Sequence, residues 1–247
     1  MVLRICILET DVIRPELVDQ YQGYGQMFQR LFAQQPIAAS FEVYNVMHGD
    51  YPPDENRYDA YLVTGSKADS FGSDPWIETL RVYLLNRYER GDKLLGICFG
   101  HQLLALLLGG RSERAHQGWG VGIHHYQVNE SERPSWMTPV IDSRLTLLIS
   151  HQDQVTALPD NATVIASSEF CPFAAYHIND QVLCFQGHPE FIHDYSRTLL
   201  EIRQQHLGDQ LFEKAMASLV EEHHGQTVGE WMMRFVAHKP KAEKEKV

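Results

Sequence analysis

The sequence has four cysteines, and no two of them are spaced as C-x-x-C. Neither a disulfide scaffold nor a thioredoxin-like redox motif is therefore indicated. The 13 histidines also lack the spacing of a metal site, since no H-E-x-x-H or paired Cys/His motif occurs. Adjacent pairs such as His124-His125 point in different directions on a strand or helix. We expect no metal and no other cofactor.

No apolar run reaches the length of a membrane span, and the N-terminus lacks the basic start and apolar core of a signal peptide. The chain also lacks a broad basic stretch, and its net charge is -11. Such a charge disfavours binding to phosphate backbones. We expect no membrane partner, no nucleic-acid partner and a location in the reducing cytoplasm.

The 247 residues contain no internal repeat and no linker rich in proline, glycine and serine. A chain of this length can bury a sizeable core, so we expect a single domain over residues 1–238. Residues 239–247 are dominated by lysine and glutamate. This composition is typical of a disordered tail.

Apolar strand-like segments alternate with helical segments in the first half of the chain. This order predicts an α/β fold in which crossover helices connect parallel strands. After residue 111, short strands separated by turns are expected to close one side of the same domain. The expected strands are 2–8, 41–46, 58–64, 94–97, 120–128 and 163–167, and the expected helices are 15–35 and 75–90.

The C-terminal part is predicted to be helical. Phe191, Tyr195, Leu199 and Ile202 recur at helical spacing, which is typical of an amphipathic helix. A similar stripe follows at 211–219, and a last short helix is expected near 231–236. We interpret these apolar stripes as packing faces, with a partner surface as the alternative.

Cys98 lies between Gly96 and Gly100, where an apolar strand meets an apolar helix. This is the sulfur counterpart of the nucleophile elbow G-x-S-x-G, whose middle residue sits in a strained turn while the glycines permit close backbone approach. The N-terminal end of the helix favours a negatively charged sulfur. The alternative is a small buried core cysteine, but the two glycines favour a nucleophile.

A nucleophilic cysteine needs a base, and His188 follows a second apolar strand. Pro189 favours an extended conformation at His188, so Glu190 can lie on the same side as the imidazole. Thiolate, imidazole and orienting carboxylate together would form a Cys-His-Glu triad. Taken alone, the segment is also consistent with an exposed histidine near the start of a helix, but its pairing with the Cys98 turn favours the triad.

These two segments resemble the G-x-C-x-G-x-Q and H-P-E signatures of the class I glutamine amidotransferases. Ser150, His151 and Asp153 also match the S-H-x-D-x-V pattern of the guanylate-synthetase-like branch. The resemblance covers about residues 40–195 and implies a three-layer, flavodoxin-like, mostly parallel sheet. It further implies that Gln102, Ser150, His151 and Asp153 bind or frame the amino-acid end of glutamine. Without it, Gln102 would be a helix-surface residue, and Ser150 and Asp153 would be turn caps.

The sequence departs from the family at one turn. Members commonly carry an S-G-G-P-like turn that contributes to the oxyanion hole, whereas this chain has Gly65, Ser66 and Lys67 there. Backbone amides need no particular side chain, so we expect Gly65, Ser66 and Phe99 to form the oxyanion hole. The altered turn resembles solitary members such as plant γ-glutamyl peptidases and leaves the natural substrate open.

The resemblance implies hydrolysis of glutamine or a γ-glutamyl amide through a thioester on Cys98. One alternative is an amidotransferase subunit that supplies ammonia to a synthetase. Because the chain has no P-loop or other nucleotide-binding motif, that synthetase would be a separate protein. Two further classes stay open: a non-catalytic binding or regulatory protein, and a cysteine peptidase or redox thiol on a similar fold.

Overall fold

The computed structural model describes residues 2–239, so the expected tail lies outside the described residues except for Lys239. The strands are β1 Leu3–Glu9, β2 Ala39–Asn45, β3 Ala60–Val63, β4 Leu94–Ile97, β5 Arg111–Arg114, β6 Gly120–Val128, β7 Arg144–His151, β8 Asp153–Ala157, β9 Thr163–Ser167, β10 Ala175–Ile178 and β11 Val182–Phe185. The helices are α1 Pro15–Tyr21, α2 Tyr24–Phe32, α3 Pro75–Glu89, α4 Phe99–Leu107, α5 His193–Leu207, α6 Asp209–Ser218 and α7 Gly225–Ala237.

The centre of the protein is a mostly parallel, nine-stranded sheet with the order β2-β1-β3-β4-β11-β10-β9-β6-β7. The five strands from β2 to β11 are parallel, and β10, β9, β6 and β7 continue the sheet in antiparallel pairs. The chain order of the parallel strands, 2-1-3-4-5, is that of flavodoxin-like folds. In such sheets ligands bind beyond the carboxyl ends of the strands, where the order reverses.

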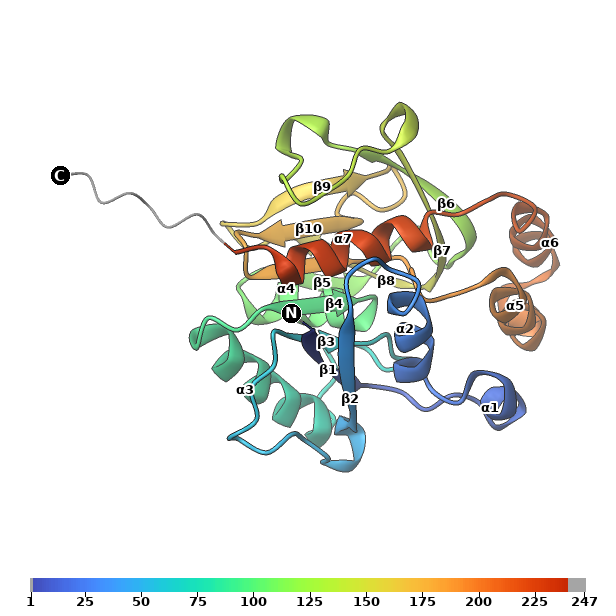
Figure 1. The fold of residues 1–247 in the computed structure, drawn as a ribbon. Coiled ribbons are helices and arrows are strands. Elements are labelled where there is room, and N and C mark those ends of the chain that lie inside the picture. Colours follow the sequence, from blue (N-terminus) through green and yellow to red (C-terminus); the bar gives the residue numbers. More distant parts are fainter. Residues whose placement is uncertain (1, 240–247) are drawn as a thin grey trace.

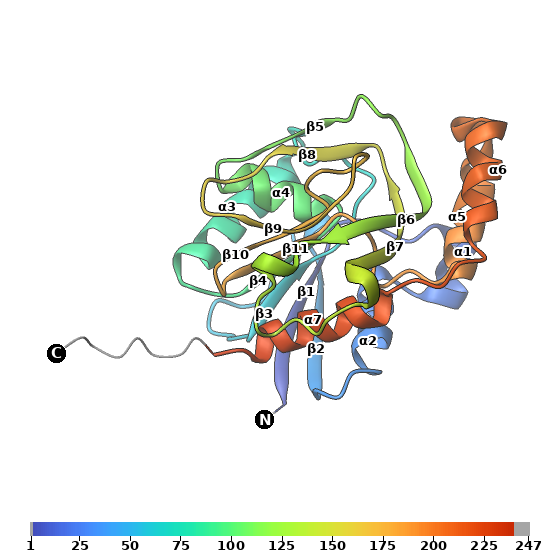
Figure 2. The same ribbon diagram turned by 90° about the horizontal axis from the view of Figure 1, so that it is seen from above.

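Helices cover both faces of the sheet, which makes three layers. Helices α3 and α4 lie on one face and α2 and α7 on the other, as the two perpendicular views show (Figure 1, Figure 2). The alternation of β1 agrees, because Ile5 and Ile7 pack toward α2 and α7 whereas Cys6 and Leu8 pack toward α3 and α4. The fold class predicted from the sequence is therefore confirmed.

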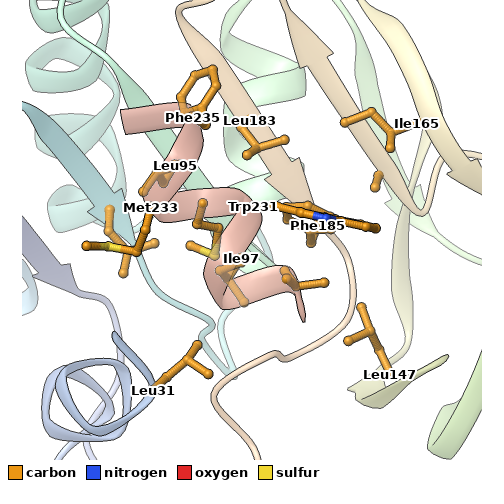
Figure 3. Packing of buried hydrophobic residues seen from close by; sticks show 14 of the residues in the cluster. Leu31, Leu95, Ile97, Leu147, Ile165, Leu183, Phe185, Trp231, Met233 and Phe235 are labelled. Atoms are coloured by element: carbon orange, nitrogen blue, oxygen red, sulfur yellow. The ribbon is translucent and has the colours of Figure 1, made fainter. Parts of the chain in front are cut away.

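The core beneath α7 is apolar and closely packed (Figure 3). Trp231 and Phe235 of α7 lie against Phe185 of β11 and neighbouring strands, and both are fully buried. The Trp231 indole nitrogen donates a hydrogen bond to the Thr138 hydroxyl at 2.9 Å, so its polar group is satisfied. The C-terminal stripe near 231–236 is thus a packing face, as predicted, although its helix is longer than expected.

A third apolar cluster lies beside the sheet, where α5 and α6 pack on β6 and Tyr21 of α1 packs against Tyr195 of α5 (Figure 1). Tyr195, Leu199 and Ala215 carry the two stripes predicted for α5 and α6. Strands β5 and β8 form a separate two-stranded antiparallel sheet. Within residues 2–239, no helix combines the length and apolar character needed to cross a membrane.

The single helix expected over 15–35 is wrong, because the structure has two helices separated at Gln22 and Gly23. Gln22 has φ of 68°, outside the helical region, and Gly23 is extended. The half-buried Glu9 carboxylate accepts a hydrogen bond from the Gly25 amide at 2.6 Å, in the first turn of α2. A Cβ on Gly23 would lie 2.8 Å from the same carboxylate oxygen, so a larger residue at this position would require the Glu9 side chain to shift.

Candidate active site

Cys98 occupies a sharp turn between β4 and α4. Its backbone has φ of 52° and ψ of -98°, a conformation that costs a non-glycine residue on the order of 1–3 kcal/mol. Two hydrogen bonds hold the turn: the Cys98 amide donates to Phe185 of β11 at 2.9 Å, and its carbonyl accepts from Gln102 at 3.0 Å. Such strain at a turn fixed from both sides is typical of a functional residue.

The glycines flanking Cys98 permit the close backbone contacts that the motif predicted. A Cβ on Gly96 would lie 2.7 Å from the Gly100 carbonyl carbon. A Cβ on Gly100 would overlap the carbonyl oxygen of Val63 in β3. The strands therefore approach α4 at a distance that only glycine tolerates.

Gly100→Ala should lower the free energy of unfolding by about 1–3 kcal/mol, because the new methyl group must displace backbone from a packed site. Denaturant unfolding followed by circular dichroism measures this change. The control is Gly49→Asn, where φ is 77° and no atom lies within 4 Å of an added Cβ; asparagine tolerates this conformation. Equal stability of the two variants would contradict the close contact at Gly100.

His188 and Glu190 follow β11 and face each other. The His188 Nδ1 atom lies 2.8 Å from Glu190 Oε1, and both side chains are buried. Because a carboxylate can only accept, Nδ1 donates, which leaves Nε2 for the Cys98 sulfur, with which His188 also interacts. The ring stacks on Phe191 at 3.9 Å between centroids, and the His188 amide donates to Leu148 at 2.9 Å. These contacts fix the position and orientation of the imidazole.

The pKa of His188 is raised to about 10. Burial alone would lower it, but the negative charges of Glu190 and Cys98, together with hydrogen bonds to both, outweigh that penalty. The imidazole therefore carries its proton at neutral pH. It is in the correct state to give a proton to a leaving group.

The loop after β3 lies next to Cys98 and His188. A Cβ on Gly65 would lie 2.7 Å from the His188 ring and 3.5 Å from the Cys98 Cβ atom. Thr10 holds the loop, since its buried hydroxyl donates to the Gly65 carbonyl at 3.0 Å and lies 3.0 Å from the Thr64 hydroxyl. This support from the end of β1 was not predicted from the sequence.

Backbone amides near Cys98 are free to receive a negative oxygen. Within residues 2–239, the amides of Ser66 and Phe99 donate no hydrogen bond, whereas the next loop amide, Lys67, donates to Asp11 at 3.0 Å. Phe99 is also the first residue of α4, where the helix dipole favours negative charge. The oxyanion hole expected at Gly65, Ser66 and Phe99 stays a prediction.

A cavity of about 250 Å³ opens beside Cys98 and is lined by all four residues expected to bind the amino-acid end of a substrate. They are Gln102, Ser150, His151 and Asp153. Gln102 is buried and donates to the Asp153 carbonyl at 2.8 Å, so the interpretation as a helix-surface residue is wrong. His151 Nδ1 lies 3.0 Å from the same carbonyl.

Charged groups line the far wall of this cavity. Arg114 Nε lies 2.7 Å from Asp153, and Arg114 Nη2 lies 3.0 Å from Asp69. Burial and the adjacent Asp69 carboxylate raise the pKa of Asp153 to about 7, with Arg114 opposing the shift. Burial lowers the pKa of His151 to about 3, so this histidine is neutral.

Several residues at the site were not predicted from the sequence, and Arg203 is the most prominent of them. Arg203 lies on α5, which was interpreted as a packing helix, and it lines the same cavity. Its guanidinium donates to the Ser150 hydroxyl at 2.5 Å and lies over the Trp119 ring. A polar position on an amphipathic helix carries no signal that distinguishes a cavity-facing arginine from an exposed one. Within the described residues, no three His, Cys, Asp or Glu side chains are placed to hold a metal ion.

Fold and site together define an α/β protein with a strained cysteine opposite a histidine–carboxylate pair. The chain belongs to the class I glutamine amidotransferase family, whose model matches residues 17–203. It is 34% identical over 203 residues to gamma-glutamyl peptidase 3 of Arabidopsis thaliana, covering 80% of this chain and 79% of that protein. It is 35% identical over 111 residues to a glutamine-hydrolyzing GMP synthase of Marinobacter nauticus, covering 43% of this chain and 21% of that protein.

Solved structures agree on the fold. A glutamine amidotransferase from Thermotoga maritima matches with a TM-score of 0.72 at 18% identity, covering 96% of this chain and 100% of that one. A glutamine amidotransferase from Methylobacillus flagellatus matches with a TM-score of 0.71 at 20% identity, covering 96% of this chain and 94% of that one. At such identities the likeness concerns the fold alone.

Proposed function

We propose that this protein is a hydrolase that releases glutamate from glutamine or a γ-glutamyl amide through a thioester on Cys98. The observation that carries the proposal is the pairing of a strained Cys98 with His188, whose Nδ1 atom lies 2.8 Å from Glu190. Nucleophile, acid/base and orienting carboxylate are the parts that acyl transfer needs.

In the first half-reaction, the Cys98 thiolate attacks the γ-carbonyl carbon and forms a C–S bond. The developing oxyanion accepts hydrogen bonds from the amides of the Gly65–Ser66 turn and Phe99. The His188 imidazolium then protonates the amide nitrogen, the C–N bond breaks, and ammonia or an amine leaves. The products are a γ-glutamyl thioester and a neutral His188.

In the second half-reaction, His188 takes a proton from water as the water oxygen attacks the thioester carbon. The C–S bond breaks, glutamate leaves, and the Cys98 thiolate and His188 imidazolium are restored. Glu190 keeps the imidazole in one tautomer throughout. Gln102, Ser150, His151 and Asp153 would bind or frame the α-amino and α-carboxylate groups in the adjacent cavity.

The second candidate is an ammonia-supplying subunit with a separate synthetase. The relatives favour the self-sufficient hydrolase, because the match to gamma-glutamyl peptidase 3 covers 79% of that protein whereas the match to the GMP synthase covers 21%. The four free, buried cysteines and the need for a reduced Cys98 suit the reducing cytoplasm.

A substrate panel on the purified protein tests the proposal. We expect unaided release of glutamate from glutamine, a γ-glutamyl amide or a γ-glutamyl peptide, with ammonia measured separately. A glutamine-like diazo-ketone should label Cys98. Labelling without unaided turnover would favour the amidotransferase subunit, and failure of both turnover and labelling would favour a non-catalytic binding protein.

A further inference from the structure

A second and larger cavity is lined by none of the four residues expected to hold the glutamyl group, although it shares Lys67 and Arg203 with the first cavity. Its volume is about 420 Å³, within the range of about 300–1,000 Å³ that small-molecule sites occupy. Segments distant in the sequence line it: the loop after β1, the start of α2, and Tyr195, Leu199 and Arg203 of α5. Ammonia leaving from glutamine would need no such space.

The large cavity connects to the nucleophile through a small cavity. That small cavity of about 30 Å³ is lined by Cys98 and His188 together with Asp11, Tyr24 and Arg203 of the large cavity. Since His188 is the group that protonates the departing nitrogen, the leaving group must lie near it. The large cavity is therefore in position to receive what is attached to that nitrogen.

The large cavity is rich in positive charge, although the chain as a whole carries -11. Its single carboxylate, Asp11, is compensated by Lys67, whose Nζ lies 3.3 Å away. Arg14 and Arg203 have no carboxylate within ion-pair distance among residues 2–239. Burial lowers the pKa of Arg203, whereas Tyr24, Tyr195 and Cys98 oppose this shift. The positive charge of Arg14 also lowers the pKa, so there is repulsion between the two guanidiniums. An anion between them would remove that repulsion.

The hydroxyl groups of Tyr24 and Tyr195 add neutral polar contacts. They lie 3.0 Å apart, at the wall of the same cavity, with their rings packed edge to face. A planar carboxylate suits such a set of donors, because guanidinium groups bind it with charge-assisted hydrogen bonds.

We propose that this cavity is the leaving-group site and that Arg14 and Arg203 select a leaving group with a free carboxylate, that is, a γ-glutamyl peptide rather than glutamine. The inference rests on the proposed function and adds the substrate class to it. Arg14 and Arg203 act by binding substrate, whereas Lys67 neutralises Asp11. A γ-glutamyl amino acid fills the site, and its α-carboxylate lies between the two guanidiniums.

The test uses a matched pair of substrates, γ-glutamyl-alanine and γ-glutamyl-alaninamide, which differ in the terminal carboxylate. The wild type should hydrolyse the acid with a kcat/KM at least about 10-fold higher than the amide, since hydrogen bonds to charged groups are worth roughly 1.5–3 kcal/mol. Arg14→Gln and Arg203→Gln should each bring this ratio to within about 3-fold of one. Because both substrates are measured on one preparation, the ratio is independent of the folded fraction.

The matched control is Arg57→Gln, an exposed arginine remote from the cavity, which should keep the wild-type ratio. Equal hydrolysis of acid and amide by the wild type would overturn the inference while leaving the proposed function intact. A wild-type preference that survives both substitutions would overturn the assignment to Arg14 and Arg203. Hydrolysis of neither compound nor glutamine would overturn the inference together with the proposed function.

Discussion

Cys98→Ala is expected to lower kcat/KM for glutamate release by at least about 10³-fold, because no thioester can form without the sulfur. The residual rate would come from the oxyanion-binding amides and substrate binding alone. The fold should survive, since alanine retains the Cβ atom of a 5% exposed residue and adds no volume. Steady-state kinetics with both glutamine and a γ-glutamyl peptide, together with mass spectrometry of the labelled protein, measures the loss.

Cys6→Ala is the matched control for Cys98→Ala. Cys6 is a fully buried cysteine on β1, and burial raises the pKa of its thiol, so that it carries no thiolate at neutral pH. We expect its removal to leave turnover and labelling close to those of the wild type. Comparable activity in Cys98→Ala and the wild type would overturn the thioester mechanism.

The nucleophile elbow could be predicted from the sequence because its determinants are local. Gly96, Cys98 and Gly100 lie within five residues, and an apolar strand followed by an apolar helix fixes where the turn occurs, although the contact that requires Gly100 comes from Val63 of β3. The pairing of His188 with Glu190 is local as well, because only Pro189 separates them. The segment is not extended as expected, since Pro189 and Glu190 form a turn in which the Phe191 amide donates to the His188 carbonyl at 3.4 Å. Both features involve residues close together in the sequence, so a short sequence pattern is enough to predict them.

The features that could not be predicted depend on contacts between distant segments. The break between α1 and α2 depends on Glu9, a half-buried carboxylate on β1 that accepts a hydrogen bond from the Gly25 amide. The support of the Gly65 turn depends in the same way on Thr10. Arg203 resembles any polar residue on an amphipathic helix until α5 is placed against the site. Tertiary contact, which a single sequence does not encode as a pattern, decides all three.

The second large effect is expected for Glu190→Gln, which keeps the shape of the side chain and removes its charge. We expect kcat to fall by about 10²–10⁴-fold, as happens when the orienting acid of a triad is made neutral. The amide presents an NH₂ group or a weaker acceptor to His188 Nδ1, so the imidazole loses its fixed tautomer. Exposed Glu213→Gln on α6 is the control, and its kcat should match that of the wild type.

The pH dependence of Glu190→Gln separates a loss of charge from a loss of structure. In the wild type, the pKa of His188 is raised to about 10, so the alkaline limb of kcat/KM should lie near pH 10. Without the Glu190 charge, the burial penalty dominates and the limb moves to lower pH. The free energy of unfolding should depend on pH in the same direction. Because the pKa of His188 in the folded protein exceeds the unfolded value of about 6.5, its protonation stabilises the fold fully below about pH 6.5. This stabilisation is lost as the pH rises toward 10. Between about pH 6.5 and 10, the melting temperature of the wild type should therefore fall more steeply than that of Glu190→Gln. If the two melting temperatures fell in parallel with pH, Glu190 would not set the charge of His188.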